Sequence, residues 1–292
     1  MITRTHNKLF TPVQVGAITL KHRIVMPPLS RLRAEWPSGV PSDLMLEYYS
    51  QRASDGGLIF TEATAVAASG RGYSVVTPDG FSRPSPHRAL ETVEIADIIK
   101  QYRAAALNAK KARFDGVELM AANGHLIDQF LQDNSNKRTD RYGGTIENRA
   151  RFLFEVVEAL VTVWGADRVG VRIAPSGTFN GMADSNPRPL FRYVAERLNN
   201  LKLAYLHVIE PRVKGGEVIA EGQGPVAAQE LSKVFHGPII AAGGFEPGTA
   251  EATVVNGDAS LIAFGRHFIA NPDLPKCPNL NRVGCIMSNL IS

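Results

Sequence analysis

Cysteine is scarce in this sequence. Two cysteines occur among 292 residues, Cys277 and Cys285, and both lie near the carboxyl end. So few cysteines exclude a disulfide framework. No histidine or further cysteine accompanies them at metal-ligand spacing, so we predict no metal site. We interpret both thiols as incidental features of a tail that covers residues 276–292.

Long apolar runs and blocks of charge are also missing. No segment approaches the roughly 18 apolar residues of a membrane span, and residues 1–20 lack the apolar core of a signal peptide. The 32 Lys and Arg residues are scattered among 28 Asp and Glu residues, for a net charge of +4. We therefore expect a cytoplasmic protein with neither a membrane nor a nucleic-acid partner.

Short segments rich in Val, Ile, Leu and Ala are typical of parallel strands that are buried on both faces. There are seven of them, at residues 23–27, 57–61, 115–119, 169–173, 205–209, 238–242 and 260–264. Amphipathic helical patterns separate them at 91–112, 146–164 and 189–200. This alternation predicts an α/β fold with a parallel sheet.

The spacing of these segments favours a (β/α)8 TIM barrel. The steps from Ile24 to Ile59, Val171 to Leu206 and Leu206 to Ile240 are 35, 35 and 34 residues, near the ~31 residues per unit of such barrels. The glycine-rich turn of a dinucleotide-binding sheet is replaced by Pro-Pro-Leu-Ser at 27–30. A complete barrel has eight strands, so one strand is unaccounted for.

In TIM barrels the active site lies at the carboxyl ends of the strands, and phosphate is often held after the last two. Here these two ends carry glycines, which let backbone N–H groups approach an anion, and an arginine. The residues are Gly243, Gly244, Gly265 and Arg266. They form either a phosphate site or simply tight strand-to-helix turns.

Five other polar residues stand within or just after predicted strands. Arg172 interrupts an apolar strand and faces either a carboxylate in the barrel or a ligand with negative charge. Asn123 and His125 follow a strand end and could reach the barrel mouth. We interpret His207 as a core or mouth histidine, and Glu62 as an acid or as a structural partner of an arginine.

Together these segments resemble the old yellow enzyme family of FMN-dependent ene-reductases over residues 8 to 275. The motifs that carry the resemblance are 9–12 (LFTP), 22–31 (HRIVMPPLSR), 47–53 (EYYSQRA), 58–64 (LIFTEAT), 122–124 (ANG), 126–131 (LIDQFL), 138–144 (RTDRYGG), 147–149 (ENR) and 264–266 (FGR). The resemblance implies one FMN-binding domain over residues 1–275. It also implies that hydride passes from NAD(P)H to FMN and then to the β-carbon of an activated alkene, such as an enone or a maleimide.

The resemblance implies roles for individual residues. It places Pro28, Leu29, Ser30 and Ala63 along the flavin ring, and Gly243, Gly244, Gly265 and Arg266 at the phosphate. It places Arg172 by the pyrimidine edge, where negative charge develops on reduction. Asn123 and Met120 stand where the family has the pair that hydrogen-bonds the substrate carbonyl, and His125 stands where it has a proton-donating Tyr.

Three departures from the family set this chain apart. Met120 replaces a histidine, and methionine cannot donate a hydrogen bond. His125 replaces the usual Tyr, and an imidazole can still act as an acid near neutral pH. The family's third strand and its flanking helix are missing, with a junction near 73–74. We therefore expect a TIM barrel that lacks this strand, with impaired or altered catalysis.

Other interpretations stay open from the sequence alone. A non-catalytic truncated or decayed paralogue of the same family would also lack the strand and the histidine. A different phosphate-binding barrel enzyme, such as an aldolase or isomerase, is disfavoured because no strand end carries a lysine suited to a Schiff base. A missing strand exposes two strand edges, which is compatible with a homo-oligomer. The choice between NADH and NADPH is open.

Overall fold

The structure is a computed structural model that describes residues 7–35, 38–67, 70, 76–77, 80–81, 88–214, 217–218 and 226–276. Cys277, Cys285 and the predicted junction near 73–74 lie outside the described residues. Across the described ranges, none of the helices combines the length and apolar character that a membrane crossing requires.

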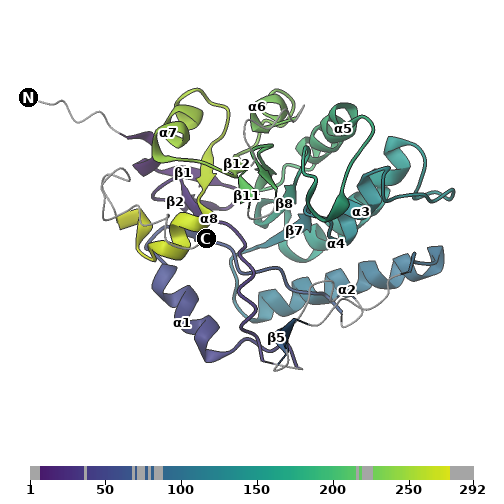
Figure 1. Cartoon of the computed structure of the whole chain (residues 1–292), viewed down its shortest axis with the longest axis horizontal. Coiled ribbons are helices and arrows are strands. Elements are labelled where there is room, and N and C mark those ends of the chain that lie inside the picture. The colour runs from purple at the N-terminus through teal and green to yellow at the C-terminus, as the bar shows by residue number, and fades with distance from the viewer. Residues whose placement is uncertain are drawn as a thin grey trace, which may run out of the picture.

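Seven parallel strands form one curled sheet (Figure 1). In chain order they are β3 (Ile24–Met26), β4 (Leu58–Ile59), β7 (Val117–Ala121), β8 (Val169–Ile173), β9 (Tyr205–Ile209), β12 (Ile239–Ala242) and β13 (Leu261–Ala263). The hydrogen-bonded order is β4-β3-β13-β12-β9-β8-β7. The last strand therefore pairs with the first, as in a closed barrel, and all seven predicted strands are confirmed.

The sheet is open between β4 and β7, and we call this opening the seam. These two strands end the hydrogen-bonded order, and within the described part of the chain no further strand pairs with either of them on that side. A TIM barrel has its third strand at this place. The fold is therefore a TIM-type barrel without that strand, as the sequence predicted.

One predicted strand was shifted. We expected residues 115–119, whereas β7 covers Val117–Ala121. Gly116 precedes the strand, and a side chain there would collide with the backbone carbonyl of Arg168. The shift places Met120 inside the strand, where it pairs with Arg172 in register.

Helices flank the strands on the outside of the sheet (Figure 1). They are α1 (Asp43–Arg52), α2 (Thr92–Lys111), α3 (Leu126–Leu131), α4 (Ile146–Trp164), α5 (Pro187–Asn200), α6 (Ala228–Leu231), α7 (Pro247–Val255) and α8 (Gly265–Ala270). Helices α2, α4 and α5 confirm the three amphipathic patterns. The Thr145 side chain caps α4 by accepting from the backbone N–H of Asn148, and α4 ends at Gly165, whose φ is +81°.

Three two-stranded antiparallel pairs accompany the sheet: β1 (Val13–Val15) with β2 (Ile18–Leu20), β5 (Val76–Thr77) with β6 (Gly80–Phe81), and β10 (Val213–Lys214) with β11 (Glu217–Val218). Side chains of β1 and β2 pack with the apolar residues inside the barrel.

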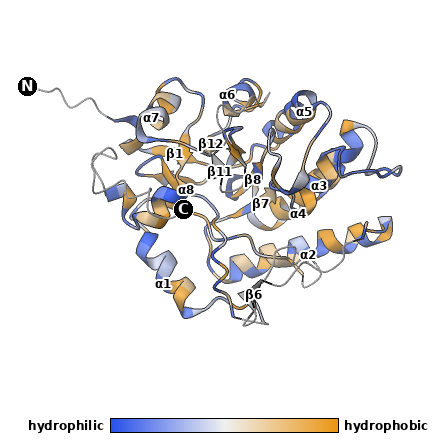
Figure 2. Ribbon diagram, in the orientation of Figure 1, coloured by the Kyte–Doolittle hydropathy of each residue, from blue (hydrophilic) through white to orange (hydrophobic). Residues whose placement is uncertain are grey.

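Apolar side chains form two layers. One lies between the sheet and the helices, and the other lies inside the barrel that the curled sheet encloses. Figure 2 shows hydrophobic residues along the strands and on the inner sides of α4 and α5. Helix α2 packs on α4, and the Trp164 indole N–H donates to the carbonyl of Ala106 at 3.0 Å. The parallel strands are thus packed against apolar side chains on both faces, and all their carboxyl ends lie at one rim.

Candidate active site

The carboxyl rim of the sheet brings the predicted site residues together, because parallel strands end on the same side. Pro28, Leu29 and Ser30 follow β3; Ala63 follows β4; Met120 lies in β7, with Asn123 and His125 after it; Arg172 lies in β8; Gly243 and Gly244 follow β12; Gly265 and Arg266 follow β13. Neighbouring ends touch: a Cβ on Gly265 would lie 3.4 Å from Cδ2 of Leu29.

A polar cluster lies inside the barrel below this rim. Nδ1 of His207 lies 2.8 Å from Oε2 of Glu118, and the two side chains are 0 % and 7 % exposed. Phe60 stacks near both His207 and Tyr205, with ring centroids 5.6 and 5.7 Å apart. His207 is therefore a buried, hydrogen-bonded histidine, as predicted.

The cluster contains groups whose titration is shifted by burial. Burial lowers the pKa of His207, the negative charge of Glu118 opposes this, and the positive charge of Arg172 adds to it. Burial also raises the pKa of Tyr205 well above its usual value, and Glu118 raises it further through its charge and a hydrogen bond. We conclude that His207 is neutral at pH 7.

Arg172 stands in the same layer, 8 % exposed. In register it pairs with Met120 of β7 and His207 of β9. Its charge acts on His207, and also on His125 at the rim. Arg172 therefore lies between the buried cluster and the mouth of the barrel.

The turn after β7 has an unusual backbone conformation. Asn123 and Gly124 have φ values of +59° and +76°, in the left-handed region that few residues other than glycine adopt readily. His125, half-buried, follows directly. Burial lowers the pKa of His125, and the charge of Arg172 lowers it further. At pH 7 most of this imidazole is neutral.

Glu62 ties two loops together. Its Oε2 accepts from the backbone N–H groups of Arg31 at 3.1 Å and Leu32 at 3.3 Å, and its own N–H donates to the Tyr49 hydroxyl at 2.8 Å. Burial raises the pKa of Tyr49 to about 12. Of the two alternatives for Glu62, the structural one fits, although its partners are backbone groups rather than a guanidinium.

The glycine turn after β12 is shaped to present backbone groups. Gly243 and Gly244 have φ values of +113° and +63°, and a Cβ on Gly243 would lie 2.6 Å from Cγ2 of Val213. A side chain is thus excluded at Gly243, and the positive φ of Gly244 disfavours one there. Arg212, which we did not predict, lies beside it with its guanidinium 4.3 Å from the Phe245 ring. Its Nε is buried and has no hydrogen-bond partner among the described residues.

The loops after β7 and β8 are joined into one wall. Asn134 Nδ2 donates to the carbonyl of Gly181 at 2.7 Å, and the backbone N–H of Ser185 donates to Asp133 at 3.0 Å. A buried ion pair between Arg149 of α4 and Asp184 anchors the same wall. These contacts join residues far apart in the chain, so no local sequence signal reveals them.

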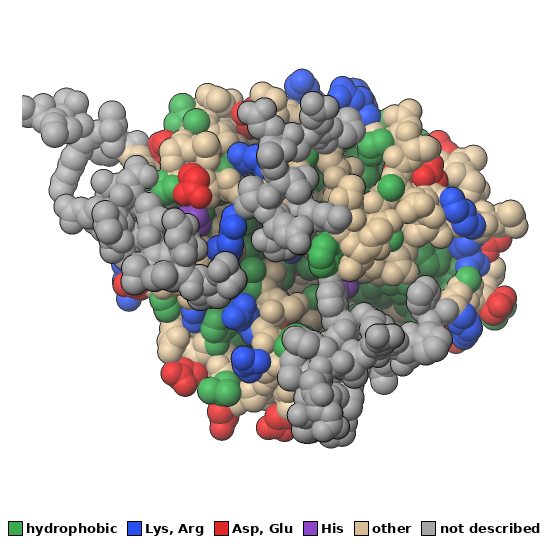
Figure 3. All heavy atoms as spheres, in the orientation of Figure 1, with side chains coloured by type: hydrophobic (Ala, Val, Ile, Leu, Met, Phe, Trp, Pro, Cys, Tyr) green, Lys and Arg blue, Asp and Glu red, His purple; other side chains and the backbone are tan. Residues whose placement is uncertain are grey.

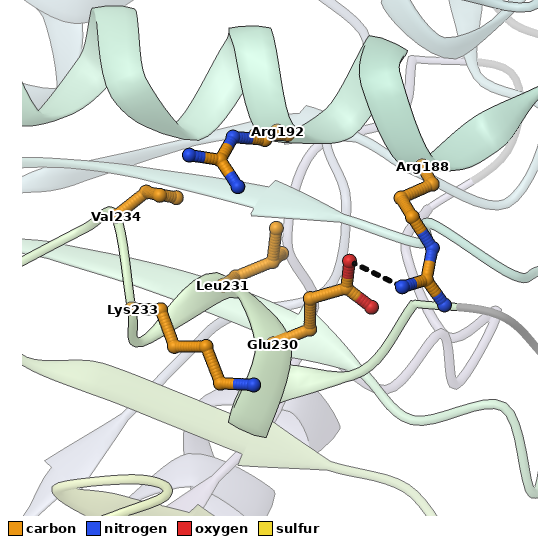
Figure 4. A pocket seen from close by; sticks show the side chains of 6 residues that line it. All are labelled: Arg188, Arg192, Glu230, Leu231, Lys233 and Val234. Atoms are coloured by element: carbon orange, nitrogen blue, oxygen red, sulfur yellow. Dashed lines mark ion pairs between the residues drawn. The ribbon is translucent and has the colours of Figure 1, made fainter.

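A separate cleft lies on the outside of the barrel between α5 and α6 (Figure 4). It holds about 220 Å³ and is lined by Arg188, Arg192, Glu230, Leu231, Lys233 and Val234. Arg188 pairs with Glu230 at 3.3 Å, and Arg192 pairs with Glu196 at 2.8 Å. Because Arg188 and Arg192 are paired with carboxylates and the cleft is remote from the strand ends, we do not assign it to the active site.

Charge on one face of the molecule gives no competing site. On the face shown in Figure 3, basic and acidic side chains are interspersed. Within the described ranges, no group of three or more His, Cys, Asp or Glu side chains could hold a metal ion.

Known proteins match this chain over most of its length. The model of the NADH:flavin oxidoreductase / NADH oxidase family matches residues 8–78 and 79–282. Putative 12-oxophytodienoate reductase 3 of Oryza sativa subsp. japonica is 37 % identical over 337 positions, which cover 94 % of this chain and 86 % of that protein. Because 337 positions exceed the 292 residues of this chain, the relative contains residues that have no counterpart here.

Solved structures are similar in fold as well as sequence. The old yellow enzyme homologue from Zymomonas mobilis has a TM-score of 0.85 and 35 % identity, covering 92 % of this chain and 91 % of that one. Morphinone reductase in complex with tetrahydroNAD has a TM-score of 0.82 and 36 % identity, covering 91 % and 89 %. This chain therefore belongs to the old yellow enzyme family of NADH:flavin oxidoreductases, whose members are FMN-dependent and take hydride from a nicotinamide cofactor.

Proposed function

We propose that this protein reduces the C=C bond of activated alkenes, such as enones and maleimides, with FMN at the carboxyl rim and NADH or NADPH as the hydride donor. One observation carries the proposal. The rim combines a buried arginine, Arg172, with the turn after β7 that carries the Asn123 amide and the glycine turn at Gly243. Together these supply the two anion-stabilising positions and the carbonyl-binding position that the reaction requires.

The residues at the rim fit the phosphate of FMN. Gly243 and Gly244 have no side chains to keep an anion away from their backbone N–H groups. Gly265 and the exposed Arg266 complete the proposed phosphate site. Arg212 adds a second guanidinium next to the turn, with an Nε that lacks a hydrogen-bond partner among the described residues.

The flavin ring has a matching surface. We propose that Pro28, Leu29, Ser30 and Ala63 lie along it and that Arg172 stands at its pyrimidine edge. FMN bound there would supply hydride transfer from the nicotinamide to the β-carbon of the alkene. Arg172 stabilises negative charge at its edge, and it is already desolvated, so its charge acts strongly.

Substrate binding is altered relative to the family. We propose that Asn123 donates a hydrogen bond to the substrate carbonyl. Met120 stands at the second donor position and has no proton to donate. In comparable sites one missing donor lowers the rate by about 10²–10³, so we expect slow alkene reduction.

His125 is the proposed proton donor to the α-carbon. Its protonated form is an acid of suitable strength, but burial and Arg172 both lower its pKa. The fraction of acid is therefore small at pH 7 and grows as the pH falls. Both departures, at 120 and 125, slow the transfer to alkene more than the transfer from nicotinamide.

A simple experiment tests the function. Purified protein should be yellow, lose its visible absorbance when NADPH or NADH is added without oxygen, and regain it with N-ethylmaleimide. A colourless protein that does not bind added FMN would contradict the proposal and favour a non-catalytic paralogue.

We further propose one domain over residues 1–275, to be tested by a single cooperative unfolding transition. A cytoplasmic location stays a prediction from composition.

A further inference from the structure

The turn that carries Asn123 and His125 needs external support. Two successive residues, Asn123 and Gly124, have positive φ. An asparagine in this region is tolerated but is higher in energy than in extended backbone. The backbone keeps such a conformation only when its surroundings fix it.

A buried carboxylate provides part of that support. Asp128 lies in the first turn of α3 and is 0 % exposed. Its Oδ2 accepts the backbone N–H of Gly124 at 2.9 Å, and its Oδ1 accepts Nε2 of Gln132 at 2.7 Å. One oxygen therefore holds the turn, and the other is anchored by Gln132, the residue directly after α3.

The turn is also held from its other side. Asn180, in the loop after β8, donates through Nδ2 to the carbonyl of Asn123 at 2.9 Å. The Cβ of Asn180 lies 2.7 Å from the position that a Cβ on Gly124 would take, so a side chain there is excluded. Gln129 Nε2 donates to the carbonyl of Gly124 at 2.7 Å. The peptide groups of residues 123 and 124 are thus fixed from two elements.

A buried carboxylate at this position is unfavourable in free energy, which indicates that it has a specific role. Burying a charged group without a counter-ion is unfavourable, and the partners that the structure gives Asp128 are an amide side chain and a backbone N–H. A helix of ordinary packing would place an apolar residue at such a buried position. Asp128 instead has an oxygen directed at the base of the turn.

We infer that Asp128 is a positioning residue, which fixes the N–H of Gly124 and thereby sets where the Asn123 amide and the His125 ring stand at the rim. The inference rests on the proposed function, because Asn123 acts there on the substrate carbonyl. Because Asp128 is fully buried, we place it in contact with neither substrate nor flavin. Its effect is confined to reactions that use the turn.

This confinement gives a specific kinetic signature. Reduced flavin is reoxidised both by alkenes and by dioxygen, and dioxygen has no carbonyl for Asn123 to hold. Asp128→Ala should lower the rate of reoxidation by N-ethylmaleimide about 10- to 100-fold, as expected for a misplaced donor. Reoxidation by dioxygen should change less than about twofold. Asp128→Asn, which keeps an acceptor oxygen for Gly124, should restore the alkene rate.

A matched control separates positioning from general loosening. Ile127 is the neighbouring residue of α3 and is 0 % exposed, and its side chain has no polar group to hold the turn. Ile127→Ala should destabilise the fold but leave the ratio of alkene to dioxygen rates within about twofold of the parent. If Ile127→Ala and Asp128→Ala lower this ratio equally, the positioning role is refuted.

A second measurement does not depend on catalysis. Hydrogen exchange of the Gly124 amide, followed by NMR, should accelerate at least about tenfold in Asp128→Ala and stay near the parent rate in Asp128→Asn. Unchanged exchange in Asp128→Ala would overturn the inference. If the parent lacks FMN or alkene turnover while exchange behaves as expected, the proposed function fails and the support of the turn by Asp128 stands.

Discussion

Glu118 and His207 are joined across an intervening strand. Glu118 belongs to β7 and His207 to β9, with β8 between them, yet Oε2 and Nδ1 are 2.8 Å apart. In register, Gly170 of β8 pairs with Glu118 on one side and with Tyr205 on the other, two residues before His207, and it has no side chain. A Cβ there would overlap the ring of Tyr205. Because Gly170 has no side chain, Glu118 of β7, the strand at the seam, contacts His207 of β9 directly.

Gly170→Ala should therefore destabilise the protein. The added methyl group forces the Tyr205 ring away and disturbs the contact between Glu118 and His207, at a cost of about 1–3 kcal/mol. Denaturant unfolding measures this loss. Gly248 is the control, because a Cβ there would meet nothing within 4 Å. If Gly170→Ala is no more destabilising than Gly248→Ala, the bridge does not support β7.

Met120→His should raise alkene reduction. It returns a hydrogen-bond donor to the position beside Arg172, which pairs with residue 120 in register. We expect kcat/KM for N-ethylmaleimide to increase by up to about 10²–10³. Reoxidation by dioxygen is the internal control and should not change. No gain would mean that the defect lies in the open barrel or in the flavin site.

Alkene reduction should depend on pH through His125. The pKa of this imidazole lies below its usual 6.5 because of burial and the nearby Arg172. The proton-donating form is lost as pH rises through this lowered pKa, so the rate should fall from about pH 5 towards pH 8. His125→Tyr should flatten the profile over this range, since a phenol stays protonated. A flat profile in the parent protein would exclude His125 as the donor.

Stability should depend on pH through Asp128. Burial raises the pKa of Asp128 from 3.8 to about 6, and its bonds with Gly124 and Gln132 oppose this only in part. Between these values the folded protein binds more protons than the unfolded chain, so this contribution to stability increases as the pH falls from 6 to below 3.8. Above pH 6 the full penalty, on the order of 3 kcal/mol, is present.

Asp128→Asn removes this penalty and keeps an acceptor for Gly124. The variant should be more stable than the parent above pH 6, and the difference should shrink towards zero near pH 4. Urea unfolding at several pH values measures it. A difference that is constant with pH would show that the pKa of Asp128 is not raised in the folded protein.

The strands and long helices were predictable because their signals are local. A continuous apolar run marks β12, apolar runs interrupted by Arg172 and His207 mark β8 and β9, and the helical repeat marks α4 along its whole length. The seam was predicted differently: the strand count indicated that one strand was missing, and the resemblance to the family placed it at the junction near 73–74. The boundary of β7 was not predictable, because the close approach of Gly116 to the Arg168 carbonyl, which leaves no room for a side chain, is a contact between distant residues.

The supports of the site were less visible in the sequence. Asp128 lies in a short segment, Leu126–Leu131, where an acidic residue is usual on an exposed helix face. The contact of Glu118 with His207 spans 89 residues, and that of Asn180 with Asn123 spans 57. Such partners are selected by register and loop packing, which a single sequence does not display.

The seam also determines how the chain tolerates a break. Because β13 pairs with β3, the first two strands are attached to the last one rather than to the strand that follows them in sequence. Cleavage of the chain between Ile59 and Val117 therefore separates two strands, β4 and β7, that are not hydrogen-bonded to each other in the seven-stranded sheet. The two fragments remain one sheet through the β3–β13 ladder, so the protein can be nicked or circularly permuted at the seam without dividing its strand pairing.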